Sequence, residues 1–297
     1  MFIVLRSGVM HENAVQASFW QGSASGAARC GLCPHACVLP EGGVGLCRAR
    51  RNVSGVLYAE SYGEVSALAL DPIEKKPLCR FKPGSLILSA GSRGCNFSCR
   101  FCQNWRISQA EPAVKFFRPE QLVDLALAKV KEGNIGLAYT YSEPAVWYEF
   151  VRDCALLAKE AGLDNVFVSN GYLNPGPLRE IAPLLAAANI DLKSCADDFY
   201  RRMCGGRLAP VRESIKILAG FCHVEVTTLV IPGCNDSEDE IARIAAWLAE
   251  ISPSIPLHVT RYYPNYRFSA PPAPKEKILR LKEVAEEFLS YVCAGNI

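Results

Sequence analysis

The sequence predicts an α/β fold of parallel strand–helix units, preceded by a small cysteine-rich appendage. From about residue 84 onward, six short apolar or β-branched runs alternate with longer segments of helical periodicity, as in successive βαβ units. Before that point the chain is rich in glycine, cysteine and turn residues, and four cysteines fall within 18 residues. We therefore expect an N-terminal metal-binding appendage with a connector over residues 1–83, and the main domain over residues 84–297.

The expected elements follow in order along the chain. Two short strands are expected in the connector, at Val56–Tyr62 and Val65–Leu70. The strands of the main domain are expected at Ser85–Ser89, Gly136–Thr140, Asn165–Ser169, Asn189–Leu192, His223–Val230 and Pro256–Tyr262. The helices are expected at Pro119–Glu132, Ala145–Ala161, Pro177–Ala187, Val211–Gly220, Ser237–Ile251 and Pro274–Tyr291. This alternation fits both an open doubly wound sheet and a (β/α) barrel, and periodicity does not separate them.

Composition narrows the functional classes. The chain has 297 residues, half of them hydrophobic, and its 32 Lys and Arg against 30 Asp and Glu leave a net charge of +2. This balance argues against disorder and gives no support for a nucleic-acid partner. No apolar run approaches the roughly 18 residues of a membrane span, and the opening MFIVLRSGVM is interrupted by Arg6 without a cleavage signature. We expect a cytoplasmic protein without a membrane partner.

Phosphate-binding glycine motifs are also missing from the place where they would matter. Neither GxGxxG nor GxxxxGK[ST] follows the first expected strand. In dinucleotide-binding and P-loop proteins that turn holds the phosphates, so both of these classes lose their main support.

The cysteines are the unusual part of the composition. There are 14 of them, and cytosolic thiols stay reduced, which favours metal ligands over disulfides for clustered cysteines. Seven form two tight groups, namely Cys30, Cys33, Cys37 and Cys47, then Cys95, Cys99 and Cys102. The other seven are scattered, as is typical of small buried hydrophobic residues; Cys195 and Cys204 are among them.

The second group forms a CxxxCxxC loop directly after the first expected strand of the main domain. Three thiolates can hold three irons of a [4Fe-4S] cluster, and no fourth cysteine follows at ferredoxin-like spacing. The open iron can bind the amino and carboxylate groups of S-adenosylmethionine (SAM), whose reductive cleavage yields a 5′-deoxyadenosyl radical.

A zinc site completed by a remote histidine would also accept three thiolates. Against it, the loop lies at the C-terminal end of a strand, where (β/α) folds place their active sites. Phe101, just before the third cysteine, could pack on an adenine ring.

On these residues the chain resembles the radical SAM superfamily. More narrowly, the Cys30–Cys47 group, the segment Asp71–Leu78 (DPIEKKPL) and the loop GCNFSCRFCQN together resemble its AmmeMemoRadiSam branch, which is pyruvate formate-lyase-activating-enzyme-like. The resemblance covers nearly the whole chain and implies a partial (β/α)6 TIM-like barrel, a [4Fe-4S] cluster, SAM, and an electron donor such as flavodoxin or ferredoxin. The chain departs from the branch at Cys79 and Arg80, where an aromatic residue and a histidine are familiar.

The resemblance also implies SAM contacts at the strand ends. The segment Tyr139–Pro144 resembles the motif that holds the methionyl ammonium, with Ser142 and Glu143 as its polar side chains. A carboxylate facing a cation is a sensible use of Glu143, although Ser142 and Glu143 also suit a helix N-terminus. The further positions that match SAM contacts in the family are Asn170, Asp191, Lys193, Ile231 in the segment Thr228–Asp236, and His258 with Arg261. Taken alone, these residues are equally typical of turns, salt bridges and structural histidines.

The first cysteine group leaves two metal centres open. Cys30, Cys33, Cys37 and Cys47 suit a closed tetrahedral zinc site, which would stabilise an appendage too small to fold on its own core, and His35 could replace one thiolate. Four cysteines equally suit an accessory [4Fe-4S] cluster that relays electrons. The sequence favours zinc slightly.

The sequence thus predicts an enzyme that uses the 5′-deoxyadenosyl radical to abstract hydrogen from a small-molecule or protein substrate, acting with a Memo-like partner. One alternative is an activating enzyme that installs a glycyl radical on a partner protein. An alternative of another class is a non-catalytic zinc or redox-sensing scaffold. The net charge of +2 disfavours a radical enzyme that modifies nucleic acid.

Overall fold

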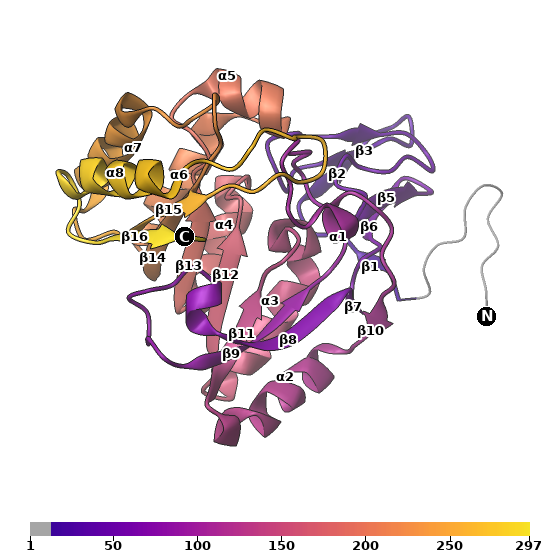
Figure 1. Cartoon of the computed structure of the whole chain (residues 1–297). Coiled ribbons are helices and arrows are strands. Elements are labelled where there is room, and N and C mark those ends of the chain that lie inside the picture. Colours follow the sequence, from indigo (N-terminus) through magenta and orange to yellow (C-terminus); the bar gives the residue numbers. More distant parts are fainter. Residues whose placement is uncertain (1–12) are drawn as a thin grey trace.

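The structure, a computed structural model, describes residues 13–297, so the opening segment MFIVLRSGVM lies outside the described residues. Its centre is an eight-stranded sheet in which β8 alone runs antiparallel to its neighbour (Figure 1). The strands, in their order across the sheet, are β16 (Val292–Gly295), β15 (Leu257–Arg261), β14 (His223–Val230), β13 (Ala187–Asp191), β12 (Asp164–Ser169), β11 (Asn134–Tyr139), β9 (Leu86–Gly91) and β8 (Ala67–Pro72).

Helices connect the parallel strands and pack against them. The sheet order follows the chain order, so each helix returns the chain to the next strand position, as in βαβ units. The pairs α2 with α3, α4 with α6 and α7 with α8 lie in contact, and α8 packs on β15 and β16. The α-helices are α1 (Trp105–Ser108), α2 (Pro119–Ala128), α3 (Tyr148–Glu160), α4 (Pro175–Ile181), α5 (Asp197–Phe199), α6 (Leu208–Ala219), α7 (Glu238–Ile251) and α8 (Lys275–Glu286).

The predicted α/β fold with parallel strands is confirmed, and the structure decides between the two architectures. The two edge strands, β8 and β16, do not pair with each other. The sheet is therefore a partial barrel. No helix in residues 13–297 is long and apolar enough to cross a membrane.

Several predicted helices have different bounds in the structure. The helix predicted over Pro119–Glu132 ends at Ala128, and the one predicted from Val211 begins at Leu208. The segment predicted as a helix from Ala145 begins as a 3-10 turn at Pro144–Trp147 and becomes α3 at Tyr148. The helix predicted over Pro177–Ala187 ends with a 3-10 turn at Leu184, and Ala187 already opens β13. Alanine favours helices, but Ala187 and Ala188 are fully buried and pair with β12 and β14, so tertiary packing overrides propensity.

The last predicted helix is too long at its C-terminal end. It ends at Glu286 rather than Tyr291, and β16 follows as an unexpected strand. A strand of four residues is too short to show a clear alternation of apolar and polar positions.

The main sheet also begins earlier than the predicted boundary at residue 83. The strand expected at Val65–Leu70 is divided between β7 (Glu64–Val65) and β8, and β8 pairs with β9 from Ala67 with Gly91 to Pro72 with Leu86. Residues 67–72 were expected in the connector, whereas they form an edge of the partial barrel.

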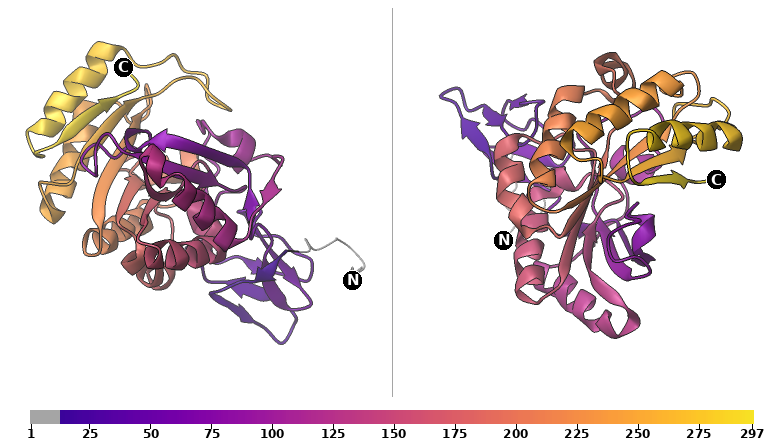
Figure 2. Two further views of the ribbon diagram at one scale, coloured as in Figure 1. Left: turned by 90° about the horizontal axis from the view of Figure 1, so that it is seen from below. Right: turned by 90° about the vertical axis from the view of Figure 1, so that its left-hand side faces the viewer.

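The residues before β7 form two small sheets that stand at one side of the molecule, away from α8 (Figure 2). Their strands are β1 (Val15–Gln16), β2 (Trp20–Gly22), β3 (Ala28–Cys30), β4 (Val38–Leu39), β5 (Arg50–Val53) and β6 (Val56–Ala59), and a separate pair joins β7 to β10 (Lys115–Phe116). Arg50 on β5 makes a buried ion pair of 2.6 Å with Glu149 on α3. The Asn174 amide also donates to the Gly31 carbonyl at 2.7 Å, and both contacts hold the appendage against the barrel.

Candidate functional site

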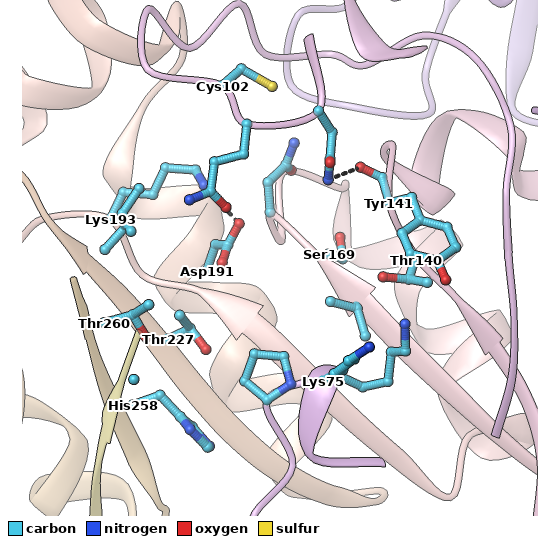
Figure 3. Close-up of a pocket in the computed structure, with 18 of the residues that line it drawn as sticks. Lys75, Cys102, Thr140, Tyr141, Ser169, Asp191, Lys193, Thr227, His258 and Thr260 are labelled. Carbon is cyan, nitrogen blue, oxygen red and sulfur yellow. Dashed lines mark hydrogen bonds and ion pairs between the residues drawn. The ribbon is translucent and has the colours of Figure 1, made fainter. Parts of the chain in front are cut away.

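A cavity of about 820 Å³ runs through the partial barrel. Figure 3 places Cys102 at one end of it and His258 at the other, with Asp191 and Lys193 along one side and Ser169, Thr140 and Tyr141 along the other. The lining includes many residues predicted from the sequence, namely Cys95, Phe101, Cys99, Cys102, Ser142, Glu143, Asn170, Asp191, Lys193 and His258. The structure thus brings together ten side chains that come from five separate segments.

The CxxxCxxC loop lies at the carboxyl end of β9, where a (β/α) fold places its chemistry. The loop is held by backbone hydrogen bonds: Ser98 N–H donates to the Cys204 carbonyl at 2.8 Å and Arg100 N–H to the Met203 carbonyl at 2.9 Å. Gly94, which precedes the first cysteine, has φ +86°, and a Cβ there would lie 2.3 Å from the Cys47 carbonyl oxygen. Glycine is therefore required where the two cysteine loops meet.

The three thiols of the loop suit a multinuclear centre. Cys95, Cys99 and Cys102 all line the cavity, yet their sulfur atoms are not within 4.8 Å of one another as a set. A single tetrahedral zinc ion would hold sulfurs about 3.8 Å apart, because each Zn–S bond is about 2.3 Å. Burial raises the pKa of Cys95 and of Cys102, whereas a hydrogen bond with Cys204 and the charge of Lys193 lower the pKa of Cys99. The spacing favours an iron–sulfur cluster.

Glu143 lies just beyond the end of β11 and is only 3% exposed. Its carboxylate accepts hydrogen bonds from Ser169 Oγ at 2.6 Å, from Asn170 N–H at 2.8 Å and from Ala145 N–H at 3.0 Å. Burial raises the pKa of Glu143 to about 7, against the lowering effect of these three donors. A cationic group in the cavity would stabilise the charged carboxylate, so this site suits an ammonium.

Asn170 connects the end of β12 to the cysteine loop. Its side-chain amide donates to Asn96 Oδ1 at 2.8 Å and to Cys95 Sγ at 3.6 Å, and its Oδ1 accepts from Tyr172 N–H at 2.8 Å. A hydrogen bond to a cysteine sulfur shifts the reduction potential of an iron–sulfur cluster that the cysteine binds. Asn170 therefore lies next to the cysteine loop and lines the cavity, and its predicted contact with SAM stays a prediction.

Asp191 is the last residue of β13, and it forms an ion pair of 2.7 Å with Lys193 at the cavity wall. Although burial disfavours its charge, Asp191 and the thiol of Cys99 hold the pKa of Lys193 well above its usual range. The ammonium lies 5.9 Å from the centre of the Phe101 ring. The pair is thus a charged wall beside the cysteine loop.

Two residues predicted on the last strands are not part of the cavity lining. The backbone N–H of Ile231 donates to Asn235 Oδ1 at 2.6 Å, and its side chain is fully buried. The Arg261 guanidinium donates to the Ala273 carbonyl at 2.6 Å and lies 5.0 Å from the Tyr263 ring. Arg261 is thus held in a loop contact rather than at the cavity.

The cavity has a third wall, and its residues are ones for which the sequence predicts no specific role. Asp71, buried Lys76 and Tyr141 meet there: the Lys76 ammonium lies 2.8 Å from Asp71 Oδ2 and 4.4 Å from the Tyr141 ring centre, and the Tyr141 hydroxyl donates to the same carboxylate. Tyr141 has φ +66°, a strained conformation typical of functional sites. Asp71 and Lys76 belong to the DPIEKKPL segment, which contributes to the family resemblance. The spacing of these residues in the sequence does not indicate that they line the cavity.

The four N-terminal cysteines line a second, much smaller cavity of about 20 Å³ together with Arg50. In the part of the chain that the structure describes, no three of their sulfurs lie within 4.8 Å of one another, which is wider than a closed zinc site. Burial raises the pKa of Cys33 to about 12. His35, considered as a ligand from sequence, has its Nε2 2.7 Å from the carbonyl oxygen of Asn96, which lies in the Cys95–Cys102 loop.

Comparisons with known proteins agree with this geometry. The chain is 40% identical over 289 residues to an uncharacterized protein of Methanocaldococcus jannaschii, covering 95% of this chain and 85% of that one. It is 27% identical over 216 residues to a candidate glycyl-radical enzyme activating enzyme of the same organism, covering 67% and 76% of the two chains. Both matches span more than the cysteine loop alone.

Two solved structures share the fold. One is TYW1 with a bound lysine–pyruvate adduct, with a TM-score of 0.53 and 20% identity over 76% of this chain and 84% of that chain. The other is Streptococcus suis SuiB bound to S-adenosylmethionine, with a TM-score of 0.57 and 12% identity over 68% and 48%. The sequence profile of the radical SAM superfamily matches residues 90–248, which is more than half of the chain. This chain therefore belongs to the radical SAM superfamily.

Proposed function

We propose that the chain is a radical SAM enzyme that abstracts a hydrogen atom from a substrate held in the 820 Å³ cavity. One observation carries the proposal: the three loop cysteines and the buried Glu143 carboxylate face the same cavity from neighbouring strand ends. Cys95, Cys99 and Cys102 would hold a [4Fe-4S] cluster, which, once reduced by the external donor, would supply the one electron needed to cleave SAM to methionine and a 5′-deoxyadenosyl radical.

The residues around the loop then have distinct tasks. Glu143 accepts the methionyl ammonium, and Ser169 fixes the carboxylate that does so. Lys193 offers a cation to the methionyl carboxylate from the opposite wall, held in place by Asp191. The Phe101 ring, 3% exposed and beside Lys193, offers an apolar face to the nucleoside and excludes water from it.

The substrate would occupy the part of the cavity away from Cys102. That part is bounded by the Asp71–Lys76–Tyr141 wall and by Thr227, His258 and Thr260 (Figure 3). Within a cavity of about 820 Å³, this part suits a small molecule or a single residue of a protein. Both are substrates that the resemblance to the Memo-associated branch implies. The 27% identical activating-enzyme relative supports the second candidate, installation of a glycyl radical on a partner protein.

Formation of 5′-deoxyadenosine tests the proposed chemistry. We would reconstitute the chain anaerobically with iron and sulfide, add SAM and a reductant, and measure 5′-deoxyadenosine by chromatography and mass spectrometry. We expect product from the wild type and none from the Cys95/Cys99/Cys102→Ala variant. A Cys222→Ala variant, altered at a half-buried cysteine between α6 and β14, is the matched control. If the fully reconstituted wild type cleaves no SAM, the proposal is wrong, and the chain is better explained as a non-catalytic zinc or redox-sensing scaffold.

We propose further that the N-terminal cysteines hold an accessory [4Fe-4S] cluster that passes electrons to the first. The sulfur spacing supports this over zinc, because no three of these sulfurs lie within 4.8 Å of one another in the described residues. The buried Arg50 cation suits the negative charge that four thiolates give to either centre. The two loops are also in direct contact, since His35 bonds the Asn96 carbonyl and the Arg93 guanidinium donates to the Arg48 carbonyl at 2.7 Å.

The relay can be separated from a structural zinc by the choice of reductant. In a Cys33→Ala/Cys37→Ala variant we expect iron to fall from roughly eight to roughly four per chain. We expect 5′-deoxyadenosine formation to slow with flavodoxin or ferredoxin as donor and to persist with dithionite. Retention of all iron, with loss of zinc, would establish the zinc centre instead.

A further inference from the structure

Three possible metal ligands from distant parts of the sequence meet at the cavity end farthest from Cys102. The ligand atoms of Cys79, His258 and Cys293 all lie within 4.8 Å of one another. His258 on β15 and Cys293 on β16 are register partners on adjacent parallel strands, and Cys79 arrives from the loop that follows the DPIEKKPL segment. All three residues line the cavity, and Figure 3 shows His258 at its lower end.

The histidine is already oriented as a ligand. Its Nε2 lies 2.6 Å from Glu225 Oε2 on β14, and in the tautomer whose Nε2–H donates to that carboxylate the lone pair of Nδ1 can bind a metal. Metal-binding histidines commonly donate their second N–H to a carboxylate, which fixes the ring and makes the ligand more basic. Among the residues that the structure describes, this is the tightest arrangement of cysteine and histidine ligands, since neither cysteine loop forms such a set.

Glu225 also fixes the position of the first cysteine. Its two carboxylate oxygens accept the backbone N–H groups of Cys79 at 2.9 Å and Arg80 at 2.8 Å, and His223 Nε2 lies 2.9 Å from Oε1. The Arg80 guanidinium stacks 4.2 Å from the Tyr291 ring, just before β16. One buried carboxylate thus holds both the loop and the histidine, so the three ligands are preorganised.

We propose that Cys79, His258 and Cys293 bind one Zn²⁺ ion whose fourth coordination position faces the cavity. Two sulfurs and one imidazole are a ligand set that zinc accepts in sites with an open position, and sulfurs this close suit a single ion rather than a cluster. The open position takes water or an oxygen or sulfur atom of a molecule in the cavity. The zinc site stands on its own contacts, and its use as a substrate anchor rests on the proposed radical function.

Metal content of the full-length, anaerobically purified chain tests the site. The protein is given Zn²⁺ and desalted, and zinc and iron are measured by plasma mass spectrometry. Relative to wild type, a Cys79→Ser/Cys293→Ser variant should lose one zinc per chain and keep all of its iron. A Cys222→Ser/Cys234→Ser variant, changed at two cysteines outside the cavity lining, should keep both. Equal zinc in all three proteins would overturn the proposal.

Two further measurements keep the test decisive if the double variant folds poorly. Glu225→Gln should weaken Zn²⁺ binding by roughly 10- to 100-fold in a chelator competition, because it removes the charge that supports His258. Unchanged affinity would contradict the site. Anaerobic alkylation and peptide mapping should find Cys79 and Cys293 as thiols protected by zinc, and a disulfide between them would refute the proposal. None of these readouts depends on SAM cleavage, so the site and the radical function can fail separately.

Discussion

The two cysteine loops use the same ligand chemistry in opposite surroundings. The Cys95–Cys102 loop opens on a cavity of about 820 Å³, whereas the Cys30–Cys47 loop encloses about 20 Å³. Beside the first lies the buried carboxylate of Glu143, which suits a bound cation, and beside the second lies the buried guanidinium of Arg50, which suits a fixed anionic centre. The loops therefore differ in access: the loop at the carboxyl edge of the sheet opens on space for a ligand, and the other does not.

The largest contrast is expected from removing one cysteine of each loop. Cys99→Ala should reduce 5′-deoxyadenosine formation to background with any reductant, because the open cluster needs all three thiolates. Cys37→Ala should leave measurable product with dithionite. We would compare the two variants by product yield per chain under identical anaerobic reconstitution. Equal losses in both would remove the functional distinction between the loops.

The second prediction concerns the attachment of the N-terminal loop to the barrel. Arg50→Ala leaves the Glu149 carboxylate buried without its 2.6 Å partner, which should lower the free energy of unfolding by about 3–5 kcal/mol. Arg280→Ala, which breaks a solvent-exposed pair with Glu238, is the control and should change the free energy of unfolding far less, because water screens exposed ion pairs. Denaturant unfolding measures both. A small effect of Arg50→Ala would mean that the appendage is held by other contacts.

The third prediction concerns the open cavity. Glu143→Gln replaces a charge-assisted hydrogen bond to the ammonium by a neutral one, and should weaken SAM binding by about 1.5–3 kcal/mol. Glu160→Gln at the exposed end of α3 is the matched control and should have no effect. Isothermal titration calorimetry of the reconstituted protein measures the affinities. If Glu143→Gln binds SAM with wild-type affinity, the carboxylate does not contact SAM and serves only as the hydrogen-bond acceptor of Ser169 and its neighbours.

The last prediction concerns the place where the two loops touch. Gly94→Ala places a methyl group 2.3 Å from the Cys47 carbonyl oxygen at φ +86°, so it should destabilise the chain by more than about 1 kcal/mol. Gly84→Ala has φ +80° with open space around it and therefore reports the backbone strain alone. Thermal unfolding separates the two. Equal shifts would show that the contact between the loops is not tight.

Much of the fold and part of the site could be predicted from the sequence because both depend on short-range patterns. The strand His223–Val230 was predicted with the bounds it has, since an eight-residue run rich in valine and threonine is a clear strand signal. Cys95, Glu143 and Lys193 were placed at successive strand ends, and parallel strands bring those ends to one edge. The family resemblance supplied the roles that spacing alone left open.

The parts that were missed depend on long-range pairing. β8 joins the sheet antiparallel and β16 adds a short edge strand, and neither topology is encoded in local periodicity. The meeting of Cys79, His258 and Cys293 depends on those same two edges. The branch departure at Cys79 was visible in the sequence, but its partners could not be known before the fold was.

The central claim is that only the centre in the Cys95–Cys102 loop is open to SAM. The most direct test is electron paramagnetic resonance of the reduced, reconstituted chain with and without SAM, in wild type and in the Cys33→Ala/Cys37→Ala and Cys95/Cys99/Cys102→Ala variants. The account predicts a SAM-dependent change in the cluster signal of the wild type and the first variant, and none in the second. A SAM-dependent signal that survives in the second variant would contradict the account.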